Sequence, residues 1–117
     1  MRNPRKVEAL HRARELAVAI HRIVPHYPEH EAHDVAEQLR RVARAVPTAI
    51  FHACVGNEDK EFLHFVNVAL RSLAEVDFLV EFLNELGFLG DDYASNIHDH
   101  QDACSEALLS LTQSLSD

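Results

Sequence analysis

Seven apolar residues between positions 62 and 83 follow one another at alternating steps of four and three. They are Phe62, Val66, Ala69, Leu73, Val76, Val80 and Leu83. An average step of about 3.5 residues keeps all of these side chains on one stripe of an α-helix. Such a stripe is the seam through which one helix packs against others. The pattern therefore predicts a long helix in a bundle or coiled coil, and it constrains the fold more than any other part of the chain.

Two amphipathic segments precede this helix. Residues 4–24 predict a first helix, with Asn3 as its N-cap and Pro4 at its first position. Its inward-facing residues are Leu10, Ala13, Ala17, Ile20 and Val24. A second helix is expected to begin between residues 29 and 33 and to end at Gly56, and Pro47 inside it predicts a kink. Its inward-facing residues are Val35, Leu39, Val42, Val46, Ile50 and Ala53.

The seam helix is predicted to start after a cap at Asn57 and to close at Gly87 and Gly90. A fourth helix is expected from Asp91 or Asp92 to about residue 115. Its seam consists of Ile97, Gln101, Cys104, Leu108, Leu111 and Leu115. Four helices of similar length joined by short turns predict an all-α, antiparallel up-down-up-down four-helix bundle, with residues 1–117 forming a single domain.

Composition and hydropathy indicate the cellular compartment of such a protein. With 47% hydrophobic and 26% charged residues the chain has an ordinary globular composition. No apolar run approaches the roughly 20 residues that span a bilayer, and no signal-peptide pattern is evident. We therefore expect a cytoplasmic protein without membrane contact. In that compartment Cys54 and Cys104 are expected to be buried free thiols.

The C-terminal half of the seam helix carries more apolar side chains than its seam requires. Phe78, Leu79, Phe82 and Leu86 fall on its other sides. A helix that is apolar nearly all round is buried on more than one face. We interpret these four residues as a homo-oligomer interface; the alternative is that loops or the N-terminal arm cover them.

Three stretches carry a resemblance to a known family. They are QLRRVARAVP at 38–47, KEFLHFVNVALRSLAE at 60–75 and LGFL at 86–89. In this order and spacing they resemble the four-helix-bundle proteins encoded in intervening sequences of bacterial 23S ribosomal RNA genes. The resemblance implies a bundle that assembles into rings of five and has no catalytic residues. It also implies relatives among the accessory proteins of diversity-generating retroelements, which associate with a reverse transcriptase and nucleic acid.

Charge is divided unevenly along the chain. Residues 1–60 hold ten basic and eight acidic residues, and residues 61–117 hold one and eleven, which together give the net charge of −8. Arg40, Arg41 and Arg44 cluster on the second helix and are the candidate polar or nucleic-acid contacts. Nucleic acid is an unfavourable partner for a chain this acidic, so we expect these arginines to pair with acids of the last two helices, within the bundle or across subunits.

The histidines do not predict a metal centre or a cofactor. Two Glu-x-x-His pairs, Glu8/His11 and Glu61/His64, have the spacing of di-iron bundles but face away from the apolar stripes. A surface zinc or nickel site near the start of the second helix is a weaker alternative. Its ligands would come from His26, Glu29, His30, His33 and Glu37. His98 and His100 are two residues apart and splay too widely to bind one ion.

No phosphate-binding loop or nucleophile motif is present, so an enzyme is not expected. The sequence predicts a non-enzymatic, self-associating bundle that acts as a scaffold or protein-interaction module, with no catalytic residues, no metal and no cofactor. The alternative is an RNA- or reverse-transcriptase-associated accessory protein that binds nucleic acid through Arg40, Arg41 and Arg44.

Overall fold

The structure is a computed structural model that describes residues 2–28 and 30–116, with the side chains of residues 30, 115 and 116 not described. Within these residues a short 3-10 helix, η1 (Pro4–Lys6), precedes four α-helices. The helices are α1 (Glu8–Ile23), α2 (His30–Val55), α3 (Asp59–Glu85) and α4 (Asp91–Ser116). The prediction of an all-α four-helix protein is confirmed. None of the described helices combines the length and the apolar character needed to cross a membrane.

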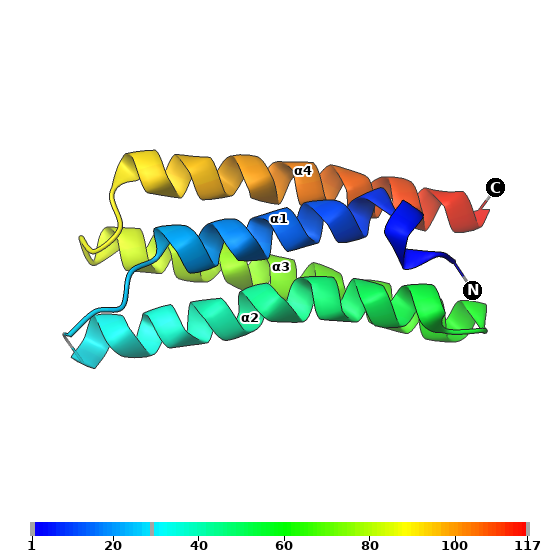
Figure 1. Cartoon of the computed structure of the whole chain (residues 1–117), viewed down its shortest axis with the longest axis horizontal. Coiled ribbons are helices and arrows are strands. Elements are labelled where there is room, and N and C mark those ends of the chain that lie inside the picture. The colour runs from blue at the N-terminus through cyan, green and yellow to red at the C-terminus, as the bar shows by residue number, and fades with distance from the viewer. Residues whose placement is uncertain (1, 29, 117) are drawn as a thin grey trace.

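The helices form an elongated bundle of 46 × 22 × 20 Å. α2 packs against α1 and α3, and α4 packs against the same two helices, so that α1 and α3 lie diagonally across the bundle. Figure 1 shows that the chain turns back at each of its three connections, so consecutive helices run in opposite directions. Both termini lie at one end of the bundle, together with the α2–α3 connection (Figure 1).

The predicted seams form the core. All seven residues of the α3 stripe are buried. The five predicted inward-facing residues of the first helix, of which the last is the C-cap of α1, are buried too. In α2 and α4 the prediction fails only at the edges, because Val35 and Leu111 are half-buried. The side chain of Leu115 lies outside the described residues. Cys54 and Cys104 are buried free thiols, as expected, and burial raises the pKa of Cys104 to about 12.

The first and third helices begin later than predicted. The Asn3 side chain does accept a hydrogen bond from the Arg5 amide, but the helix that it caps is η1. Val7 then adopts an extended conformation, and α1 starts only at Glu8. Likewise Glu58 is the N-cap of α3 in place of the predicted Asn57, and its side chain makes no capping hydrogen bond. Pro47 lies within α2, which continues through it to Val55.

The α3–α4 turn is tightly organised. The Phe88 amide donates to the Leu83 carbonyl and the Gly87 amide to the Asn84 carbonyl, which is the Schellman pattern for the end of a helix. Gly87 has a φ of 84° and Gly90 a φ of 99°, a region that favours glycine. Tyr27, in the α1–α2 connection, donates its hydroxyl proton to the Phe88 carbonyl at 2.7 Å. Its ring also packs edge-on against the ring of Phe88. This contact joins the two connections at the end of the bundle opposite the termini.

Candidate interaction surface

Two aromatic side chains stand on the outer face of α3. Phe78 is 62% exposed and Phe82 is 38% exposed. They are one helical turn apart, and their rings stack with centroids 6.1 Å apart and planes 3° from parallel. At 100° per residue both project away from the buried seam of α3. No other helix of the described bundle can therefore cover them, because α2 and α4 pack on the seam side.

The other two predicted interface residues behave differently. Leu79 is only 3% exposed, so its assignment to an exposed interface was wrong. It lies three residues after Val76 and four before Leu83, both buried, and it shares their face of the helix. Leu86, the last predicted residue, is half-buried at the C-cap of α3. The stacked pair Phe78 and Phe82 therefore remains as the candidate interaction surface.

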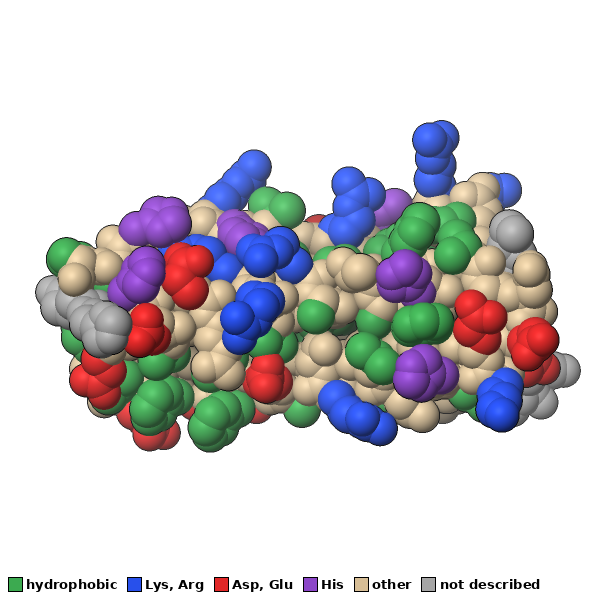
Figure 2. Space-filling model, turned by 90° about the horizontal axis from the view of Figure 1, so that it is seen from below, with side chains coloured by type: hydrophobic (Ala, Val, Ile, Leu, Met, Phe, Trp, Pro, Cys, Tyr) green, Lys and Arg blue, Asp and Glu red, His purple; other side chains and the backbone are tan. Residues whose placement is uncertain are grey.

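Exposed apolar side chains also occur elsewhere on α3. Leu63 is 41% exposed and Leu70 is 36% exposed, at positions that the sequence argument did not consider. The predicted interface included only the surplus apolar residues in the C-terminal half of the helix, and these two lie in its N-terminal half. Figure 2 views the bundle with α2 nearest and shows hydrophobic side chains scattered among His and charged groups, with Lys and Arg side chains projecting from the upper edge of the view.

Arg40 is not a surface residue. It is 5% exposed, and its guanidinium donates hydrogen bonds to the backbone carbonyls of Val24 and Pro25 and to the Glu37 carboxylate. Val24 is the C-cap of α1, where helix carbonyls lack intrahelical partners. The planar, many-donor guanidinium satisfies them from inside the bundle. The prediction that Arg40 contacts nucleic acid or an external partner is therefore wrong.

The neighbouring arginines remain at the surface. Arg41 and Arg44 are both exposed on α2. The ion pairs of Arg12 with Glu8 and Glu15 and of Arg40 with Glu37 lie within single helices. For Arg40, a pair within α2 thus replaces the predicted pairing with acids of the last two helices inside the bundle. Partial burial, followed by the charges of Arg44 and Arg40, lowers the pKa of His21 below 6.5, while Glu37 opposes this shift.

The predicted orientation of the two Glu-x-x-His pairs is confirmed. All four side chains are exposed; Glu8 pairs with Arg12, and His11 makes a hydrogen bond with the Arg5 carbonyl at 2.7 Å. The alternative site near the start of α2 falls partly outside the described residues, which do not include Glu29 or the side chain of His30. The Glu37 carboxylate already pairs with Arg40, and the Nδ1 atom of His26 lies 3.8 Å from the same carboxylate oxygen.

This fold and these sequence stretches agree with one protein family. The family model described as 23S rRNA-intervening sequence protein matches residues 5–110. The chain belongs to this family. The matched range includes α1, α2 and α3 entirely and most of α4, so it covers the bundle and both stretches that carry the resemblance in α2 and α3. None of the curated proteins matches the chain.

One cluster in this 23S rRNA-intervening sequence family protein was missed by sequence reasoning. Asp77 and Glu81 on α3 and His98 on α4 bring one ligand atom each to within 4.8 Å of one another. The sequence contained half of the signal, since Asp77 and Glu81 are spaced i,i+4 and share a face. The other half depends on how α4 is aligned against α3, which periodicity does not specify.

Proposed function

We propose that this protein is a non-enzymatic, self-associating module of the cytoplasm that serves as a scaffold or protein-interaction unit. The assembly is a homo-oligomer, most simply the ring of five that the family resemblance implies. The observation that carries the proposal is the exposed, stacked pair of Phe78 and Phe82 on the outer face of α3. Large apolar side chains grouped in this way on a water-soluble surface mark interaction sites.

Free-energy arguments indicate how large the interface must be. Burying two Phe side chains fully contributes roughly 3–6 kcal/mol, whereas association costs an estimated 4–15 kcal/mol in lost freedom of motion. The pair alone is therefore insufficient. Leu63 and Leu70 are exposed on the same helix but lie roughly a quarter-turn round its surface from the stacked pair. An interface of useful size would have to extend around α3 to include them.

Light scattering coupled to size-exclusion chromatography tests the proposal. At micromolar concentration the wild-type protein is expected at a multiple of its 13.2 kDa chain mass, five-fold for the ring. The double variant Phe78→Glu/Phe82→Glu should shift it to the monomer, because the two carboxylates that replace the two rings on each chain cannot be buried between copies. Leu109→Glu on α4 is the matched control, since Leu109 is 57% exposed and lies on a different helix. A wild-type monomer, or an assembly that survives the double variant, contradicts the proposed interface.

A further inference from the structure

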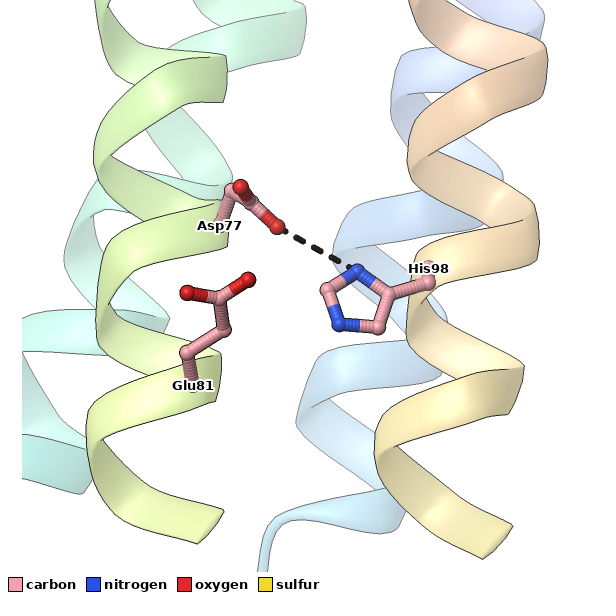
Figure 3. A group of neighbouring side chains, drawn as sticks. All are labelled: Asp77, Glu81 and His98. Carbon is pink, nitrogen blue, oxygen red and sulfur yellow. Dashed lines mark ion pairs between the residues drawn. The ribbon is translucent and has the colours of Figure 1, made fainter. Parts of the chain in front are cut away.

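Three ligand-bearing side chains meet in the groove between α3 and α4. Asp77 and Glu81 project from successive turns of α3 and His98 from α4, and Figure 3 shows both carboxylates and the imidazole ring directed into the space between the helices. The Nδ1 atom of His98 lies 3.2 Å from a carboxylate oxygen of Asp77. Asp77 and His98 are half-buried, and Glu81 is exposed at the rim.

An ion pair between Asp77 and His98 explains only two members of this cluster. The third member, Glu81, brings a carboxylate oxygen to within 4.8 Å of the ligand atoms of both others. Two carboxylates one helical turn apart repel, and the Asp77–His98 ion pair leaves the Glu81 carboxylate outside it. A cation held between the three groups removes the repulsion and uses all three ligand atoms.

A second, independent observation lies in the same groove. It has a volume of about 260 Å³, and its lining includes Asp77, His98, Gln101 and Asp102. Gln101 is 7% exposed. Its Nε2 atom donates to the Leu73 carbonyl at 3.2 Å, but its Oε1 atom is buried without a donor, alone in this respect among the side chains that the structure describes. Buried acceptors normally have a partner, and this one, on a residue that lines the groove, has none.

From these observations we propose that Asp77, Glu81 and His98 form a binding site for a divalent transition-metal ion such as Zn²⁺. One imidazole and two carboxylates are ligands that zinc accepts, at about 2.0–2.2 Å. Drawing atoms that lie within 4.8 Å of one another onto one ion requires only side-chain rotation. Three protein ligands leave a coordination position for water. Metal-bound water is a hydrogen-bond donor, and the Oε1 atom of Gln101 is an acceptor without one. The ion clamps α3 to α4.

This site departs from the expectation, drawn from the sequence, that the protein holds no metal. The reasoning about His98 and His100 was that these two residues cannot share one ion. The proposed partners of His98 are instead on the neighbouring helix. The proposal does not depend on self-association, because all three ligands come from one chain.

Isothermal titration calorimetry with ZnCl₂ on the full chain tests the site. We expect one high-affinity equivalent of Zn²⁺ per chain and at least a tenfold loss of affinity in His98→Ala, Asp77→Asn and Glu81→Gln. Glu81→Gln changes an exposed residue and is the variant least able to disturb folding. His100→Ala is the matched control, because His100 lies two residues away on the same helix and is also half-buried; it should bind like the wild type.

A thermal-shift measurement separates binding from a purely structural ion pair. Zn²⁺ should raise the melting temperature of the wild type and of His100→Ala, but not that of Glu81→Gln. Co²⁺ should give a visible d–d absorption band that is lost in His98→Ala. The proposal is overturned if the wild type binds no Zn²⁺ below 100 µM. It is also overturned if His98→Ala binds as the wild type does, or if His98→Ala and His100→Ala are weakened equally, because either result would leave only adventitious binding by surface histidines.

Discussion

A buried guanidinium completes the C-terminal end of α1. Arg40 donates to the Val24 and Pro25 carbonyls from α2, so one side chain both caps a helix and holds two helices together. Glu37 supplies the opposite charge beside it. Of the three clustered arginines, Arg40 is therefore the one that stabilises the fold, whereas Arg41 and Arg44 are exposed to solvent.

Replacing Arg40 by Ala should therefore destabilise the fold. We expect a loss of about 2–4 kcal/mol in the free energy of unfolding, because two backbone acceptors lose their donor and a cavity remains. Urea denaturation followed by circular dichroism measures this loss. Arg41→Ala, at the adjacent exposed position, should stay within about 0.5 kcal/mol of the wild type. Equal stabilities of the two variants would show that the Arg40 hydrogen bonds contribute nothing.

His21 provides a test of pH dependence at the same end of the molecule. Its pKa lies below 6.5 in the folded protein because of partial burial and the nearby charges of Arg44 and Arg40. The unfolded chain therefore binds more protons than the folded one just below pH 6.5. The contribution of His21 to stability is present above pH 6.5 and is lost as the pH falls through its folded pKa.

Removing one of the two charges should raise this pKa. Arg44→Gln is expected to shift the pKa of His21 upward toward 6.5, as measured by NMR titration of its ring protons. Arg41→Gln is the control, since Arg41 is not among the groups that shift it. A wild-type pKa at or above 6.5 would contradict the arrangement of charges around His21.

At the scale of the elements, the α3–α4 turn depends on backbone conformation. Gly87 has a positive φ, and nothing lies within 4 Å of the position that its Cβ would take. Gly87→Ala should thus cost about 1 kcal/mol through backbone strain alone, without a steric clash. Thermal or urea denaturation measures it. Gly87→Asn should cost less, because Asn tolerates this region better; the opposite order would show that side-chain contacts dominate at this turn.

The helices could be predicted from the sequence because periodicity reports which side of a helix is buried. It placed all seven α3 seam residues correctly in the core. It failed where a single residue decides the outcome: Val7 interrupts the first helix, and Leu79 lies at the edge of the seam and is buried. Periodicity also treats a charged residue as exposed, and so it misplaced Arg40, whose partners are backbone carbonyls of another segment.

The candidate sites were predictable only in part for a related reason. Phe78 and Phe82 lie on one helix, so their shared outward face follows from spacing alone. Asp77, Glu81 and His98 come from two helices, and their meeting depends on the alignment of α4 along α3. That alignment results from packing between helices rather than from the period of either one.

At the scale of the whole molecule, charge opposes nucleic-acid binding. The net charge is −8, and one of the three arginines proposed to contact phosphates is buried. We expect no retardation of a fluorescent RNA in a gel-shift experiment at 50 mM salt, because too few exposed cations remain to displace counterions from the backbone. A shift that disappears in Arg41→Glu/Arg44→Glu, but not in Lys60→Glu, would contradict this expectation and favour the RNA-associated alternative.

The contact between Tyr27 and Phe88 has a consequence for the motions of the bundle. Loops and turns are usually among the least stable parts of a protein and open locally while the core stays folded. Here a hydrogen bond and an aromatic contact join the α1–α2 connection to the α3–α4 connection. Neither turn can move away from the core without giving up its hold on the other. We therefore expect the end of the bundle opposite the termini to open as a single cooperative unit, with amide exchange at the two turns rising and falling together.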